Sequence, residues 1–214
     1  MSETTHTLDM TMMFAVHDAL RRDLAQLARV SATTDDDPRQ ILRAAVGCEM
    51  FKSFLRVHHT SEDVAVWGPM ETRLTDQPDR ALLDAMEAEH AAIDPLLDAV
   101  DAAIADRESG PQRLGDVVDA LYLSVAGHLR HEEDEGLRLV ESVLTPGQWA
   151  AFGQDHRNRV GADSARYLPW LLQGASPETV AAILGRMPEE IKRAYATEWR
   201  AEYLDVRPWN PRIR

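Results

Sequence analysis

Four long segments with apolar residues at helical spacing make up most of the first 144 positions, and each of them carries histidine. They run from about 8 to 30, 38 to 67, 78 to 107 and 112 to 144, and short polar, Gly- or Pro-containing breaks separate them. Strand-like alternation is weak throughout, so the periodicity predicts an all-α fold. Four helices joined by short loops pack most simply as an up-down-up-down four-helix bundle.

The composition changes beyond residue 144. Residues 145–214 contain four of the five tryptophans and three of the four tyrosines. Helix starts are indicated at Ser176-Pro177 and at Pro188, and apolar residues at helical spacing argue against disorder. We therefore expect two parts: a four-helix bundle at 1–144, and a helical, aromatic-rich C-terminal extension at 145–214. The extension would pack on the bundle or join two copies as a homodimer.

Charge and cysteine usage restrict the partners and the compartment. The chain has 36 Asp and Glu against 23 Lys and Arg, a net charge of −13, which disfavours nucleic-acid and membrane-surface partners. Cys48 is the single cysteine, so no disulfide can form within the chain. Neither a membrane span nor the basic-then-apolar order of a secretion signal is found. These features predict a soluble cytoplasmic protein.

Two of the four segments contain the spacing His-x-x-x-Glu, in His58 with Glu62 and in His128 with Glu132. Residues four positions apart lie on the same face of a helix. At about 100° per residue, Glu62 also lies between His58 and His59, about 40° from the first and about 60° from the second. This arrangement suits a carboxylate that bridges two metal ions, each of which also binds an imidazole.

Two further histidines, His17 and His90, stand among apolar residues and should point into the bundle. Di-metal sites in bundle cores are built from carboxylates and imidazoles on facing helices, and burying so many polar groups without partners would cost several kcal/mol each. Mixed imidazole and carboxylate ligation suits iron or manganese rather than a structural zinc site. The candidate metal ligands are His17, His58, His59, Glu62, His90, His128 and Glu132.

Alternatives remain for the neighbouring polar residues. His131 with Glu135 is a second His-x-x-x-Glu pair, but it faces away from Glu132 and ranks second. We expect Asp63, Glu133 and Asp134 to face solvent or to orient an imidazole from outside. His6 and His156 have no carboxylate at helical spacing and are expected on the surface. Each His-x-x-x-Glu pair taken alone could be a solvated surface pair.

The motifs resemble the hemerythrin-like, or HHE, cation-binding family over about residues 8–144. The resemblance rests on FAVHDALRRDL, HHTSEDVAVWGP, EAEHAAI and HLRHEEDEGL. It implies a four-helix bundle around a non-heme di-iron centre that binds dioxygen or a related small ligand. By resemblance, His17 and His58 would serve one iron, and His59, His90 and His128 the other. Glu62 and Glu132 would bridge the two ions.

Two departures from hemerythrin proper affect the ligand set. Its third helix supplies two histidines four residues apart, whereas the positions flanking His90 are Met86 and Asp94, so we assign the missing ligand to His59. In hemerythrin proper the last bridging carboxylate follows its histidine by five residues. The same spacing counted from His128 would make Glu133 the bridging ligand. The four-residue spacing of the broader family selects Glu132.

The ligand count predicts one open coordination position. Five histidines, two bridging glutamates and a shared oxo or hydroxo group leave one position free on two six-coordinate ions. A small diatomic ligand (O2 or NO) or peroxide would bind there, for carriage, sensing or peroxide handling. The alternative is an iron- or redox-responsive interaction module in which metal occupancy controls the extension. No sequence motif supports the third class of function, an enzyme that acts on an organic substrate.

Overall fold

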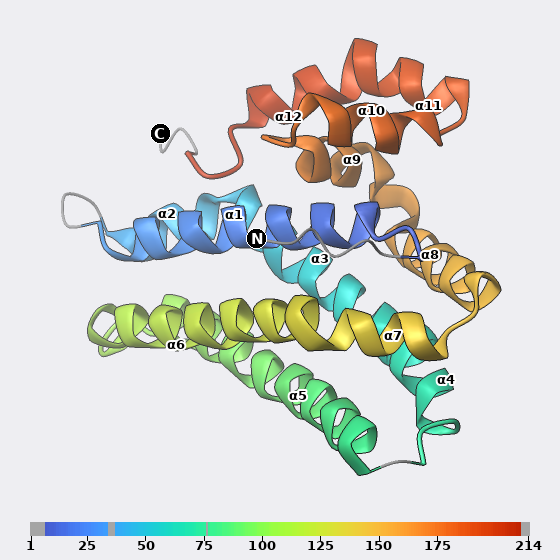
Figure 1. Ribbon diagram of the computed structural model, residues 1–214. Helices are drawn as coiled ribbons and strands as arrows, with labels where there is room; N and C mark the ends of the chain where they lie inside the picture. Colours follow the sequence, from blue (N-terminus) through green and yellow to red (C-terminus); the bar gives the residue numbers. More distant parts are fainter. Residues whose placement is uncertain (1–6, 34–36, 76, 211–214) are drawn as a thin grey trace.

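The computed structural model describes residues 7–33, 37–75 and 77–210, and within these ranges the chain forms helices and turns without a strand. Four helices build its centre: α1 (Thr11–Ser31), α3 (Val46–Glu62), α5 (Gln77–Ala105) and α6 (Gly110–His131). In Figure 1, α1 lies above α6, and α3 and α5 cross them obliquely. The predicted all-α bundle is confirmed for the described residues, while the up-down-up-down order stays a prediction.

The segment predicted as one helix from 38 to 67 forms several pieces. The first, α2 (Pro38–Ala44), begins at Asp37, whose side chain accepts a hydrogen bond from the backbone N–H of Arg39. The extended backbone of Ala45 (φ −79°, ψ 103°) then separates α2 from α3. At the other end the helix does not stop at Gly68-Pro69 as predicted. It continues into α4 (Gly68–Glu71) because the Gly68 N–H bonds to the Asp63 carbonyl.

Two π-helical turns interrupt the long helices. The first, η1 (Asp63–Trp67), joins α3 to α4, and the second, η2 (Glu132–Gly136), joins α6 to α7 (Leu137–Val143). A π turn pairs each N–H with the carbonyl five residues back, which widens the helix locally, and such turns are frequent at functional sites. Each of these two begins where a His-x-x-x-Glu pair ends. The regular α-helical spacing of both pairs is therefore kept.

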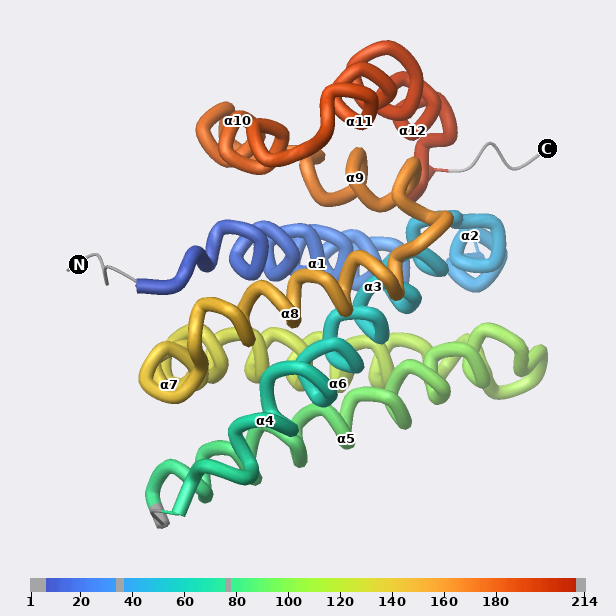
Figure 2. Tube along the Cα trace, turned by 90° about the vertical axis from the view of Figure 1, so that its right-hand side faces the viewer, coloured from blue at the N-terminus to red at the C-terminus, as the bar shows by residue number. Residues whose placement is uncertain are grey.

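The C-terminal segment folds back along the bundle. Its first helix, α8 (Pro146–Val160), packs along α3 and η1, and α9 (Ser164–Leu172) packs on α1, as Figures 1 and 2 show. Trp170 and Leu171 of α9 belong to the same buried apolar cluster as Leu20 and Leu24 of α1. The helical elements beyond α7 are α8 (Pro146–Val160), η3 (Gly161–Asp163), α9 (Ser164–Leu172), α10 (Pro177–Gly185), α11 (Glu189–Ala194), η4 (Tyr195–Trp199) and α12 (Arg200–Val206).

Asp23 of α1 links the bundle to two distant tryptophans. Its side chain is 1% exposed, and its two oxygens accept hydrogen bonds from the indole N–H groups of Trp170 (2.6 Å) and Trp209 (3.1 Å). The Trp209 ring lies against Gly47, where a Cβ atom would come within 2.6 Å of it, so only glycine allows this approach. Burial raises the pKa of Asp23 above its usual range.

We expect Asp23→Ala to lower the free energy of unfolding by about 2–6 kcal/mol, because it leaves two indole donors without their acceptor at about 1–3 kcal/mol each. Asp23→Asn should have roughly half this effect, since one amide oxygen can still accept. Urea unfolding followed by tryptophan fluorescence measures both values. Equal stability of the parent and Asp23→Ala would show that this contact does not hold the C-terminal segment in place.

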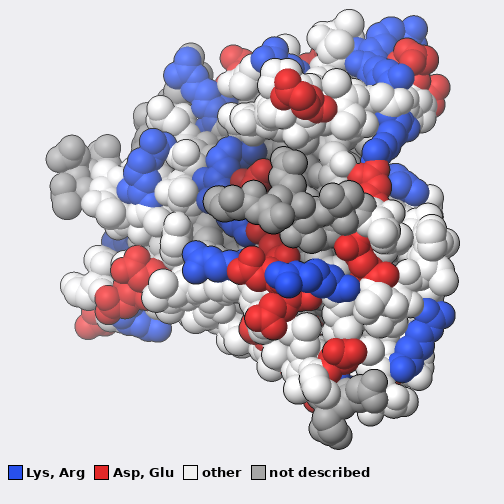
Figure 3. Space-filling model, in the orientation of Figure 1, with Lys and Arg blue, Asp and Glu red and all other residues white. Residues whose placement is uncertain are grey.

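The surface mixes charges of both signs. On the face shown in Figure 3, Asp and Glu side chains lie beside Lys and Arg and do not form one continuous acidic patch. Over the described part of the chain, no helix is both long enough and apolar enough to cross a membrane.

Candidate metal centre

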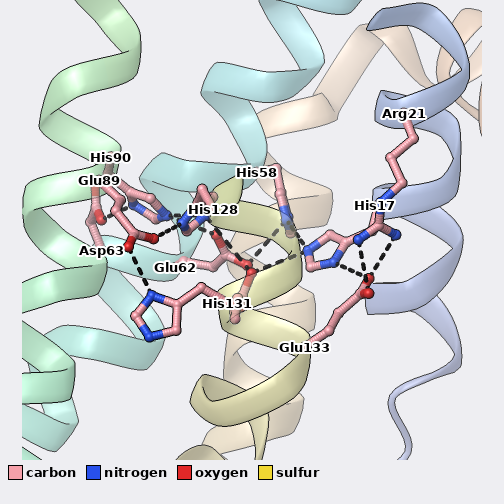
Figure 4. Close-up of polar contacts among 11 residues, drawn as sticks. His17, Arg21, His58, Glu62, Asp63, Glu89, His90, His128, His131 and Glu133 are labelled. Carbon is pink, nitrogen blue, oxygen red and sulfur yellow. Dashed lines mark hydrogen bonds and ion pairs between the residues drawn. The ribbon is translucent and has the colours of Figure 1, made fainter. Parts of the chain in front are cut away.

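The structure brings all seven predicted ligands together at the centre of the bundle. Figure 4 labels His17, His58, Glu62, His90 and His128 among them. They form two groups that share Glu62, and the ligand atoms within each group lie within 4.8 Å of one another. Every member is buried. The side chains come from α1, α3, α5, α6 and the start of η2. The first group is His59, Glu62, His90 and His128, and the second is His17, His58, Glu62 and Glu132.

Imidazole nitrogens converge in pairs within each group. The Nε2 atoms of His17 and His58 are 3.0 Å apart, and so are those of His90 and His128. Two ligands bound at right angles to one ion, with bonds of about 2.1 Å, lie about 3.0 Å apart. Each nitrogen pair therefore has the separation of two neighbouring ligands on a metal ion.

The carboxylate of Glu62 faces both nitrogen pairs. Its Oε1 lies 3.1 Å from Nε2 of His58, and its Oε2 lies 3.6 Å from Nε2 of His90. Glu132 is also placed between the groups, with Oε2 at 3.2 Å from Nε2 of His17 and 3.9 Å from Nε2 of His128. One oxygen of Glu62 directed at each group is the arrangement of a bridging carboxylate.

Outer carboxylates orient three of the imidazoles. In each case the Nδ1–H donates to an acidic side chain, which leaves the Nε2 lone pair directed at the centre. Arg21 holds one of these acids, Glu133, through two hydrogen bonds of 2.8 Å (Figure 4). The pairs are His17 with Glu133 (2.8 Å), His90 with Asp63 (2.7 Å) and His128 with Glu89 (3.0 Å).

The wide turn η2 lets two consecutive glutamates contact opposite sides of one ring. Glu132 lies beside Nε2 of His17, while Glu133 accepts from its Nδ1. Glu133 is half-buried, and Glu132 is fully buried. Glu132 therefore lies on the side of His17 that faces the centre, and Glu133 contacts the same ring from outside.

His59 completes the first group in place of a second histidine on α5. Its ring stacks on that of His90, with centroids 4.0 Å apart and an interplanar angle of 11°. His131, the second-ranked alternative, is not part of either group. Its Nδ1 instead donates to Glu89 at 2.8 Å, and its side chain is 30% exposed.

The centre contains buried polar atoms that lack a protein partner. All four carboxylate oxygens of Glu62 and Glu132, together with Nε2 of His59, are buried and have no hydrogen-bond partner among the described residues. The nearest imidazole nitrogens are close to these oxygens but not in hydrogen-bonding directions. Unpaired buried groups of this kind cost free energy unless a cation binds them. The residues present fit a pair of metal ions.

Electrostatics favours the same interpretation. Burial and the neighbouring Glu132 raise the pKa of Glu62 well above its usual value, because adjacent buried carboxylates resist being charged together. Burial and neighbouring imidazoles lower the pKa of His58 and His59, so both stay neutral. Burial opposes protonation of His17, but Glu132 and Glu133 outweigh it and raise its pKa to about 9. Cations would relieve the repulsion between the carboxylates and accept the neutral nitrogens as ligands.

Comparison with known families agrees with this geometry. Residues 9–140 match the family model of the hemerythrin HHE cation binding domain. The chain belongs to the hemerythrin HHE family. Its two buried clusters of histidine and glutamate fit a metal-binding domain of this kind. Comparisons with curated proteins and with solved structures give no match. The hemerythrin HHE match ends within α7, so α8 to α12 lie outside it.

Two residues near the centre, Glu89 and His156, lie where the sequence pattern did not predict them. Glu89 was not singled out, because it adjoins His90 on α5 while its partners, His128 and His131, lie on another helix. The prediction that His156 lies on the surface is wrong, since it is only 7% exposed and its ring is 6.2 Å from that of His58. Apolar residues stand four positions before and after His156 on α8, and this spacing could have predicted that its side chain is buried. His6 lies outside the described residues.

A pocket of about 260 Å³ between α3 and α5 reaches the first group of ligands. His59 and His90 form its inner wall, and Nε2 of His59 has no partner among the described residues. The remaining lining residues include both charged and small side chains: Leu55, Arg56, Thr60, Asp63, Glu87, Ala91 and Asp94. The pocket therefore adjoins the first group of candidate ligands on the side of His59 and His90.

Proposed function

We propose that this protein is a non-heme di-iron protein that binds a small ligand, O2, NO or peroxide, for carriage, sensing or peroxide handling. The main support is the position of Glu62, whose two oxygens face the imidazole pairs of two separate groups. Iron supplies reversible ligand binding and electron transfer when it is bound, and manganese is the alternative metal for this donor set.

The donor set favours binding over oxidation of a substrate. The two groups contain five imidazoles and two carboxylates, so most ligands are neutral. Neutral donors stabilise highly oxidised metal less than carboxylates do. The outer acids Asp63, Glu89 and Glu133 hold the imidazoles in fixed orientations. The protein thus contributes a rigid, buried and nitrogen-rich site.

Apolar side chains keep bulk water away from the centre. Trp67 is 1% exposed, and its ring lies 6.3 Å from that of His90. Met86 is fully buried, and its sulfur is close to the π turn at Gly136. In such an environment a bound small ligand is protected from competing reactions with water.

We predict that Ala91→Phe slows ligand association without changing the iron content. Ala91 is exposed on α5 and lines the pocket, so a phenyl ring there would narrow the route to His59 and His90. Ala88→Phe is the matched control, because Ala88 is exposed on the same helix and does not line the pocket. Stopped-flow mixing of the reduced, iron-loaded protein with NO measures the rate. Equal rates for Ala91→Phe and the parent would exclude this pocket as the route.

The proposed function is tested by anaerobic iron loading followed by exposure to each ligand. We expect about two iron ions per chain and a change in visible absorption when O2, NO or peroxide is added to the reduced protein. Comparing the three ligands at equal concentration identifies the preferred one. Failure to retain iron, or retention with no spectral response to any of the three, would contradict the proposal.

A further inference from the structure

His58 differs from three of the other candidate ligands, His17, His90 and His128. The Nδ1 groups of His17, His90 and His128 donate to carboxylates, whereas Nδ1 of His58 is buried and has no partner among the described residues. A metal-binding histidine almost always donates its second N–H to an outer partner, which fixes the ring and increases its basicity. Leaving a buried N–H without an acceptor also costs free energy. A partner for His58 is therefore expected nearby.

The C-terminal segment places a second unpaired imidazole beside His58. His156 of α8 is buried, and its Nε2 has no partner among the described residues. The rings of His58 and His156 are 6.2 Å apart at an angle of 70°, and α8 packs along α3 at this point. Tyr167 of α9 follows, with its ring 5.4 Å from that of His156 and its hydroxyl also unpaired.

The ring separation is close to that of a hydrogen-bonded pair. A direct N–H···N bond with the nitrogens about 3 Å apart places two imidazole centroids about 5 Å apart. A single bridging water would extend this to about 7 Å. The observed 6.2 Å lies between these values. This separation is compatible with a direct hydrogen bond after rotation of a ring, or with one bridging water molecule.

We propose that His156 is a positioning residue for the metal ligand His58, accepting the Nδ1–H of His58 directly or through one water. His156 thus has the role for His58 that Glu133, Asp63 and Glu89 have for His17, His90 and His128. Because His156 lies beyond the hemerythrin match at 9–140, the C-terminal segment completes the metal centre. The inference rests on the proposed function, since it requires His58 to bind a metal.

The test compares variants at position 156 in the full-length chain. His156→Leu removes the acceptor, and His156→Gln keeps an oxygen that can accept in its place. Loss of an outer partner typically weakens metal binding by roughly 10- to 100-fold. We expect the affinity for Fe²⁺ to fall by this factor in His156→Leu and to stay close to that of the parent in His156→Gln. Phe152→Leu is the packing control, because Phe152 is also buried on α8 and has no polar atom.

A spectroscopic readout separates positioning from packing. In the Co²⁺-loaded protein, NMR detects the exchangeable N–H signals of the bound imidazoles. One of these signals should be lost or exchange faster in His156→Leu, and it should be retained in His156→Gln, in Phe152→Leu and in Tyr167→Phe. Loss of the signal to the same extent in His156→Gln or in Phe152→Leu would show that packing, and not an acceptor at position 156, protects the N–H, and would overturn the proposal.

The possible failures are distinguishable. If the parent binds two ions and His156→Leu matches it in affinity and in N–H signals, the role of His156 is wrong, and the proposed function is unaffected. If the parent binds neither Fe²⁺ nor Co²⁺, both proposals fail.

Discussion

Replacing Glu62 by alanine should prevent both metal ions from binding. Glu62 is the one residue shared by the two groups of candidate ligands, and each of its oxygens faces a different imidazole pair. The loss of affinity should exceed the roughly 10- to 100-fold that follows from removing an outer partner. Glu62→Gln should behave in the same way while keeping the size of the side chain, because a neutral amide is a weak bridge.

The matched control is Glu133→Gln. Glu133 adjoins the centre and accepts from Nδ1 of His17, but it does not belong to either group. This variant should reach the parental iron content at saturating iron, with an affinity lower by roughly 10- to 100-fold. Iron analysis and titration of the purified proteins provide both values. Full iron content in Glu62→Ala at limiting iron would show that Glu62 is not a bridging ligand.

Removing the metal should lower the melting temperature substantially. A ligand that binds only the folded state stabilises it by about 2.7 kcal/mol when its free concentration is 100 times its Kd, so two ions contribute about 5 kcal/mol. In a chain of this size, about 1 kcal/mol shifts the melting temperature by roughly 2–4 °C. The iron-loaded protein should therefore melt about 10–20 °C above the metal-free protein.

Calorimetry before and after treatment with a chelator measures this difference, and the result should depend on free metal concentration. Readdition of Fe²⁺ should restore the higher value. Glu62→Gln is the control, because its melting temperature should not respond to iron. A parent protein whose melting temperature is unchanged by saturating iron would contradict binding at the buried clusters.

The local sequence was sufficient to predict which candidate ligands at helical spacing face the centre of the bundle. His58 with Glu62 and His128 with Glu132 face the centre because residues four apart share one face of a helix. Inward-facing His17 and His90 could be recognised from their apolar neighbours. The wheel position of His59 placed it on the other side of Glu62 from His58, and the structure brings it into the group with His90 and His128.

Features that depend on contacts between helices could not be predicted in this way. The π turns at 63–67 and 132–136 leave no mark in the apolar periodicity, although η2 lets Glu132 and Glu133 reach opposite sides of His17. The role of Glu89 depends on how α5 packs against α6, which places His128 and His131 within its reach.

The contacts of the C-terminal segment could not be predicted from the local sequence either. Its aromatic residues predicted packing but not their partners. Asp23 is a single acidic residue within α1, and its bonds to Trp170 and Trp209 span most of the chain. His156 was assigned to the surface because no carboxylate stands near it in sequence, whereas its neighbour in space is another imidazole, His58.

The central claim is that the two side-chain groups bind a pair of ions. Anomalous X-ray diffraction at the iron edge, from crystals of the iron-loaded protein, tests it most directly. We expect two peaks on either side of the Glu62 carboxylate, one beside His17 and His58 and the other beside His90 and His128. A map from iron-saturated crystals with no peak at these positions would contradict the account.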